Sequence, residues 1–158
     1  MVKRAIYPGS FDPFTNGHLD IVKKATELFD EVYIVIGTNP QKRRSFNCDG
    51  MKAAIENTLA ACEITNCKVF VYDGLIAKFA KENDIKYMIR GLRNNLDYNY
   101  EENIAEVNKL INPEMEYIYF RADNIAVSSS MVRELNYYGQ NVSEYVPKPV
   151  LDYIASVK

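Results

Sequence analysis

Apolar and polar residues alternate along the chain in blocks whose spacing predicts a regular succession of strands and helices. Short apolar runs rich in β-branched residues predict five strands, at residues 3–7, 31–37, 67–73, 85–91 and 115–122. Apolar positions at helical spacing predict further helices, at residues 51–62, 75–83 and 100–111, after Ser130, and around 149–157. One more helix follows the first strand and its loop, with an apolar face made of Ile21, Val22, Ala25, Leu28 and Phe29.

Strands that alternate with helices pair in parallel through right-handed crossovers. The run EVYIVIG at residues 31–37 is so uniformly apolar that both its faces must be covered. We therefore predict an α/β fold, a doubly wound, Rossmann-like parallel sheet of five strands with helices on both faces. The 158 residues suit one such domain, spanning 1–158, and we detect no repeat in them.

Composition and charge exclude several classes of protein. The formal net charge of −2 argues against a protein that binds nucleic acid through its phosphates. The sequence shows neither a signal peptide nor an apolar run near the roughly 20 residues that a membrane span needs, so we expect a cytoplasmic protein without a membrane partner. Cys48, Cys62 and Cys67 have no CxxC spacing and lie near no histidine, which predicts free thiols.

Polar and cationic residues gather where the predicted strands end. Doubly wound sheets bind their ligands outside the carboxyl ends of the strands, where the strand order reverses. Segments rich in Gly, Ser, Lys, Arg and His follow all five strands, at residues 9–11, 38–44, 73–76, 90–93 and 126–130. Each signal is weak alone, and their shared edge makes them a candidate site.

Two of these segments suit phosphate but admit an ordinary structural explanation. His18, the only histidine, lies beside Gly17 at the start of the first predicted helix, where unpaired backbone N–H groups favour an anion. The alternative is a helix-capping or half-buried histidine satisfied by a backbone carbonyl. Ser128, Ser129 and Ser130 can be a helix N-cap, although three hydroxyls exceed what capping requires.

The cationic residues of this edge have the chemistry of a phosphate site. Arg90 and Arg93 offer forked donors that match phosphate bidentately, and Lys42 offers a mobile point charge. Gly9 allows a close backbone approach and Ser10 adds a hydroxyl donor. A solvated surface is the alternative for each cationic cluster.

Absent motifs narrow the chemistry further. The sequence contains no GxxxxGK[ST], no GxGxxG after the first strand and no GxSxG, and its single histidine allows no confident hydrolase triad. A P-loop protein, a dinucleotide-dependent enzyme and a serine hydrolase are therefore disfavoured. The cationic and hydroxyl groups instead indicate a site that positions phosphates and neutralises developing charge.

Several stretches together resemble a known family. "GSFDPFTNGH" resembles the (T/H)xGH signature of the nucleotidylyltransferase superfamily, and "SSS" ahead of a helix resembles its second signature. With Lys42, "IRGLRNNLDYNYE" and "VSSSMVREL", the chain is similar over nearly its whole length to the bacterial phosphopantetheine adenylyltransferases. The resemblance implies transfer of the adenylyl group of ATP to 4'-phosphopantetheine, giving dephospho-coenzyme A and pyrophosphate, the penultimate step of coenzyme A synthesis. A phosphate nucleophile is already ionised near neutral pH and needs no general base.

The resemblance also implies roles for residues. His18 would bind the ATP phosphates and stabilise the transition state, Ser10 and Lys42 would hold the attacking phosphate, Arg90 would bind phosphopantetheine and Arg93 the ATP phosphates. The pantetheine arm would lie against Leu75 and Ile76. The ATP pocket would further include Ser10, Phe11, Gly91, Leu92, Glu101, Asn124, Ile125, Ala126, Val127, Ser128, Ser129 and Ser130.

Further expectations follow from the same resemblance. It implies Mg²⁺ held mainly by the ATP phosphates without a protein ligand, a homohexamer built as a dimer of trimers, and coenzyme A as a feedback ligand. After Phe46, family members often carry a Leu-Glu-Glu-Arg-like run where this chain has NCDGMK, with Met51 near the usual arginine. This segment favours a helix less, so we expect the helix to start later. Asn124 stands where an aromatic residue is common and would change how the nucleotide packs.

Two alternatives stay open. A relative with another acceptor, such as nicotinamide mononucleotide adenylyltransferase or glycerol-phosphate cytidylyltransferase, shares the first turn and the helix-start signature, although IRGLR with a following Tyr and Glu favours pantetheine. The second alternative is a nucleotide-binding regulatory module without turnover. The joint presence of His18, Ser10, Lys42, Arg90 and Arg93 argues against it, because binding alone would not demand the full set. The length and the lack of a KMSKS-like loop exclude an aminoacyl-tRNA synthetase fragment.

Overall fold

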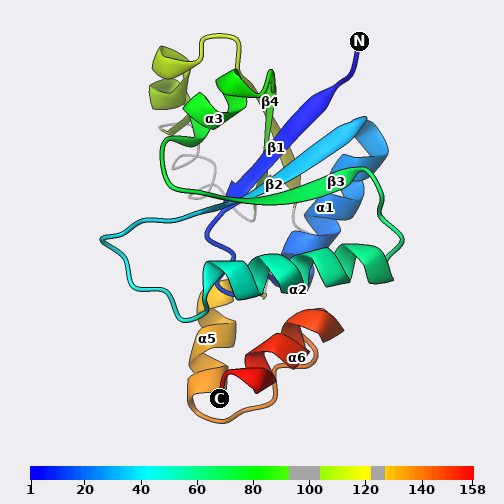
Figure 1. Ribbon diagram of the computed structural model, residues 1–158, viewed down its shortest axis with the longest axis vertical. Helices are drawn as coiled ribbons and strands as arrows, with labels where there is room; N and C mark the ends of the chain where they lie inside the picture. Colours follow the sequence, from blue (N-terminus) through cyan, green and yellow to red (C-terminus); the bar gives the residue numbers. More distant parts are fainter. Residues whose placement is uncertain (93–103, 122–126) are drawn as a thin grey trace.

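The computed structural model describes residues 1–92, 104–121 and 127–158, and these form a five-stranded sheet covered by helices (Figure 1). The strands run in the order β3-β2-β1-β4-β5, and all neighbouring pairs are parallel. They are β1 (Arg4–Gly9), β2 (Glu31–Gly37), β3 (Cys67–Tyr72), β4 (Tyr87–Leu92) and β5 (Glu116–Arg121). The predicted parallel sheet is confirmed.

The strand order reverses beside β1. The chain adds β2 and β3 on one side of β1 and then crosses back to place β4 on the other side. The β1 and β4 strands pair only at Ala5↔Tyr87 and Ile6↔Met88, although β1 continues to Gly9 and β4 to Leu92. Pro8 has no N–H with which to continue a ladder. The carboxyl halves of the two central strands therefore separate at the switch point, where doubly wound sheets bind ligands.

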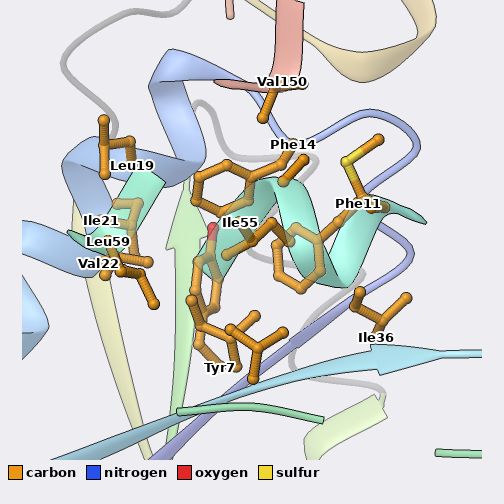
Figure 2. Close-up of a cluster of buried hydrophobic side chains, with 14 of the residues drawn as sticks. Tyr7, Phe11, Phe14, Leu19, Ile21, Val22, Ile36, Ile55, Leu59 and Val150 are labelled. Carbon is orange, nitrogen blue, oxygen red and sulfur yellow. The ribbon is translucent and has the colours of Figure 1, made fainter. Parts of the chain in front are cut away.

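Helices cover both faces of the sheet, as the sequence predicts. In Figure 1, α3 lies above the strands and α2 below them, with α5 and α6 beyond α2. Ile6 and Met88 pack with Ala80 of α3, whereas Tyr7 packs on the other face with Ile55 of α2 (Figure 2). The helices are α1 (Asn16–Leu28), α2 (Cys48–Ala61), α3 (Ile76–Glu82), α5 (Ser129–Tyr137) and α6 (Lys148–Ser156), and residues 104–111 are also helical.

The start of α2 differs from our prediction. The side chain of Asn47 accepts hydrogen bonds from the N–H groups of Asp49 and Gly50 at 2.8 and 3.1 Å, so the segment expected to delay the helix begins it with an N-cap. A Cβ at Gly50 would lie 2.3 Å from the ring of Tyr153 in α6, so glycine here allows α6 to pack closely. Met51 is fully buried and belongs to the core.

Smaller differences occur at element ends. Leu28, expected on the apolar face of the first helix, is the last residue of α1 and is 62% exposed. Gly9 is the last residue of β1 rather than part of the loop that follows it, and Arg90 lies within β4, which extends to Leu92. The predicted helix at 100–111 is described from residue 104, and its first four residues lie outside the described chain. Among the described helices, none has both the length and the apolar character to cross a membrane.

Candidate active site

A cavity of about 370 Å³ opens at the switch point. Four residues that the sequence assigns to the site line it: Ser10, Leu75, Ile76 and Arg90. They come from the turn after β1, the start of α3 and the second half of β4. The structure thus brings together the two predicted pantetheine-side residues, the predicted arginine and the predicted hydroxyl.

The cavity has an apolar wall and a cationic group. Pro8, Met88 and Ile104 add apolar surface to the two α3 residues, and Thr38, Asn39 and Asn108 add polar atoms. Arg90 Nη1 donates a hydrogen bond to the carbonyl of Pro8 at 2.8 Å. Sequence reasoning missed Met88 and Asn108, because an ordinary apolar strand position and a polar helix position carry no signal before the fold is known. A ligand with an apolar arm and an anionic group suits this lining.

His18 is part of the cap of α1. Thr15 is the N-cap, and its side-chain oxygen accepts the N–H of His18 at 3.3 Å. In return, the backbone N–H of Thr15 donates to His18 Nδ1 at 3.0 Å. The capping interpretation is therefore correct, although the ring accepts from an N–H instead of binding a carbonyl. Because Nδ1 accepts, the proton of the neutral imidazole sits on Nε2, which is then the ring's donor.

Aromatic rings fix the plane of this imidazole. The ring of Phe11 lies edge-on to it at a centroid distance of 4.9 Å, and Phe14 and Tyr7 lie 5.5 and 6.3 Å away. Phe11 and Phe14 are themselves buried in the cluster that Figure 2 shows between the sheet and α2. The orientation of His18 therefore depends on the turn that carries Phe11.

The three serines at the start of α5 have different partners. Ser128 is the N-cap, and its oxygen accepts the N–H of Met131 at 3.1 Å. Ser129 Oγ donates to the carbonyl of Pro13 at 2.8 Å, which joins α5 to the turn before α1. Ser130 Oγ accepts a hydrogen bond from Arg133 at 3.1 Å, so its own proton points elsewhere. Capping accounts for the first hydroxyl only.

A carboxylate joins the loop after β2 to the turn after β1. Both oxygens of Asp12, which is 6% exposed, accept backbone hydrogen bonds, from Ser45 and Phe46, each at 2.9 Å. Lys42 lies on the same loop, exposed to solvent, and is not among the residues that line the cavity. The N-terminus of α1 and the start of the serine segment also lie close together, since a Cβ at Gly17 would be 3.8 Å from the carbonyl oxygen of Val127.

The remaining predicted residues divide into two groups. Gly91 and Leu92 are the last residues of β4, directly after Arg90. Five predicted residues lie outside the described chain: Arg93, Glu101, Asn124, Ile125 and Ala126.

Cysteine chemistry is disfavoured at two of the three cysteines. Cys48, Cys62 and Cys67 are free, as predicted. Burial raises the pKa of Cys67 to about 12 and also raises the pKa of Cys48. Because the thiolate is the nucleophile, both groups are protonated and inert near neutral pH.

Comparison with known proteins finds a matching family and similar proteins that cover nearly the whole chain. A family model described as cytidylyltransferase-like matches residues 6–135. A phosphopantetheine adenylyltransferase of Cytophaga hutchinsonii is 43% identical over 149 residues, which cover 93% of this chain and 98% of that protein. Proteins of the same name from Shouchella clausii and Thermotoga neapolitana are each 40% identical, covering 99% and 92% of this chain and 98% and 91% of their own lengths.

Proposed function

The chain belongs to the cytidylyltransferase-like family and, within it, to the phosphopantetheine adenylyltransferases, and from this premise we propose that it transfers the adenylyl group of ATP to 4'-phosphopantetheine. An oxygen of the acceptor phosphate attacks the α-phosphorus of ATP, the bond between that phosphorus and the bridging oxygen to the β-phosphate breaks, and pyrophosphate leaves. The observation that carries the proposal is the cavity at the switch point, which combines Ser10 and Arg90 with the apolar side chains of Leu75 and Ile76.

The cavity suits the acceptor. The apolar wall would contact the pantetheine arm, and the guanidinium of Arg90 would bind its phosphate in a forked arrangement. Ser10 would add a hydroxyl donor, and the exposed ammonium of Lys42 would reach over from the loop after β2. No side chain has to remove a proton, because the attacking phosphate is already ionised.

The start of α1 suits the phosphates of ATP. His18 would donate from Nε2, the atom that the cap leaves as the ring's donor. The first turn of α5, with the hydroxyl of Ser130, would add donors for the same phosphates. Rate enhancement would come from positioning and from stabilising the charge of the transition state.

Magnesium would accompany ATP. The carboxylate of Asp12 is engaged by two backbone N–H groups and is buried, which suits an ion that keeps its waters and is held by the substrate's phosphates. When bound, it would neutralise phosphate charge. The residues named above would position the phosphates.

Assembly, regulation and location complete the proposal. A homohexamer is supported by family membership and by Val107 and Leu110, which are 58% and 84% exposed and offer apolar surface for a contact between subunits. Coenzyme A shares the chemical groups of the product, dephospho-coenzyme A, and would bind in the same cavity as a feedback ligand. A cytoplasmic location is supported by three free thiols, which a reducing compartment preserves.

A pyrophosphate-release assay with ATP and Mg²⁺ tests the reaction. We expect release with 4'-phosphopantetheine, with dephospho-coenzyme A identified by mass, and none with nicotinamide mononucleotide or glycerol 3-phosphate. Pyrophosphate release with one of the latter two acceptors would support the proposed site but would show that the acceptor substrate is a different one. ATP binding without release for any of the three would favour the regulatory module.

A further inference from the structure

Arg44 holds the turn after β1 from the side of the neighbouring loop. Its Nη1 donates to the carbonyl of Ser10, and its Nη2 donates to the carbonyl of Phe11 at 3.3 Å. Its Nε donates to the carbonyl of Phe46 in its own loop at 2.9 Å. The side chain is only 18% exposed, and Nη2 lies 3.7 Å from Asp12 Oδ1. One guanidinium therefore ties the loop that carries Lys42 to the turn.

Arg133 and Ser129 hold the same turn from α5. Arg133 Nη1 donates to the carbonyl of Asp12 at 2.7 Å, and Ser129 Oγ donates to the carbonyl of Pro13 at 2.8 Å. The second nitrogen of the guanidinium, Nη2, donates to Ser130 Oγ at 3.1 Å. All four consecutive carbonyls of residues 10–13, which we call the 10–13 turn, thus accept hydrogen bonds from side chains of two other segments.

The 10–13 turn needs such support. Phe11 has a φ of 45°, a left-handed conformation that strains a residue with a Cβ by about 1 kcal/mol or more. Strain of this kind persists only where surrounding contacts fix it. The turn presents Ser10 to the cavity and sets the ring of Phe11 against His18. A shift of the turn would therefore displace both groups together.

We propose that Arg44 and Arg133 are positioning residues, which clamp the 10–13 turn and so align Ser10 and His18 for the proposed transfer. This assignment rests on the proposed function. Neither arginine has to touch a substrate, and each acts through hydrogen bonds to main-chain carbonyls. The clamp also connects the three segments expected to contact phosphates: the loop with Lys42, the turn with Ser10, and the start of α5 with Ser130.

The test compares alanine and lysine variants of the clamp with a matched control. Arg133→Ala should lower kcat about 10- to 100-fold, as small misalignments of catalytic groups do, with smaller changes in KM. Arg133→Lys keeps one donor for the Asp12 carbonyl and should retain intermediate activity, and Arg44→Ala should change kcat in the same direction. Arg4→Ala removes a guanidinium at the amino ends of the strands, away from the cavity, and should leave kcat unchanged.

Chemical rescue separates positioning from a general loss of structure. Guanidinium ion at millimolar concentration, far below the molar range that unfolds proteins, should restore part of the kcat of Arg133→Ala and none of any loss in Arg4→Ala. A loss that neither guanidinium nor lysine restores, and that follows the loss of melting temperature, would make Arg133 a purely structural residue and overturn the proposal.

A second readout does not depend on turnover. Because His18 is the only histidine, the imidazole NMR signals of the untagged chain report on it alone. These signals should move in Arg133→Ala and Arg44→Ala, since the ring of Phe11 shifts against the imidazole, and stay in place in Arg4→Ala. Wild-type turnover tests the proposed function separately.

The outcomes are decisive for the clamp. Unchanged kcat and unmoved His18 signals in folded Arg133→Ala and Arg44→Ala would overturn it. If Arg133→Ala does not fold, Arg133→Lys and Arg44→Ala are measured in its place with the same criteria. If wild-type protein turns over another acceptor, kcat is measured with that acceptor and the NMR comparison stands unchanged.

Discussion

At the amino ends of the strands, Arg4 Nε donates to the carboxylate of Glu31 at 3.0 Å, whereas at the carboxyl ends Arg44 and Arg133 donate mainly to backbone carbonyls. The hydroxyl of Tyr33 donates to the same Glu31 oxygen at 2.8 Å. A guanidinium paired with a carboxylate forms a neutral unit, while one bonded to carbonyls has a fixed position and keeps its charge. Arg133 is held in the second way and keeps its positive charge beside the start of α5, whereas Arg44 also pairs with the carboxylate of Asp12 at 3.7 Å.

The pKa shifts at the amino edge agree with local pairing. The hydrogen bond from Tyr33, and next the one from Arg4, lower the pKa of Glu31 below its usual range. The hydrogen bond to Glu31 in turn raises the pKa of Arg4. Charge at this edge is thus satisfied within the protein, and we expect substitutions here to change stability and not catalysis.

The largest effect is expected from substitution of His18, at the carboxyl ends of the strands. His18→Ala should lower kcat by at least about 100-fold, comparable to removing one donor that stabilises a transition state. It should also lower the melting temperature by about 2–4 °C, because the N-cap loses a partner worth about 1 kcal/mol. Steady-state kinetics and thermal unfolding measure the two effects.

His18→Gln separates the two roles of the residue. Glutamine at this capping-box position offers an oxygen to the N–H of Thr15, so the melting temperature should return towards that of the wild type. The kcat should stay low, because the imidazole donor is gone. Wild-type kcat in a folded variant of either kind would contradict the catalytic role.

An intermediate effect is expected at Arg90. Arg90→Gln should raise KM for 4'-phosphopantetheine about 10- to 100-fold, the range of one to two hydrogen bonds to a charged group, with a smaller change in KM for ATP. For Arg90→Lys, the KM for 4'-phosphopantetheine should lie between those of the wild type and Arg90→Gln, since a point charge replaces the forked donors. Equal increases for both substrates would show that this arginine does not distinguish the acceptor.

The smallest effect is expected at the amino edge. Glu31→Gln should lower the melting temperature by at most a few degrees at pH 7 and leave kcat unchanged. Since the pKa of Glu31 is lowered by folding, its ionised form stabilises the protein above the ordinary glutamate pKa of about 4.3, and this contribution disappears as the pH falls through the lower folded value. The difference between variant and wild type should therefore shrink below about pH 4 in thermal unfolding. A difference that grows in acid would contradict this sign.

The alternation of strands and helices was sufficient to predict the parallel sheet and the edge where Ser10, Leu75, Ile76 and Arg90 meet. This succeeds because buried parallel strands must be apolar on both faces and because their carboxyl ends share one edge. The start of α2 was mispredicted because Asn47 was weighed as a poor helix former, although asparagine is among the best N-caps.

The clamp could not be predicted in the same way. Arg44 and Arg133 bind main-chain carbonyls, and every residue has a carbonyl, so such a contact leaves no complementary residue type in the sequence. The left-handed backbone of Phe11 leaves no trace either, because phenylalanine has no preference of its own for this conformation.

The contact between Gly50 and Tyr153 has an evolutionary consequence. A larger residue at position 50 would meet the far end of the Tyr153 side chain, which would have to move or be replaced by a smaller one, so a substitution at either position affects which substitutions are tolerated at the other. The start of α2, just after the loop with Lys42, and α6 are therefore coupled through this contact. In related proteins we expect these two positions to covary. We expect a smaller residue at position 153 to be acquired before a larger residue at position 50.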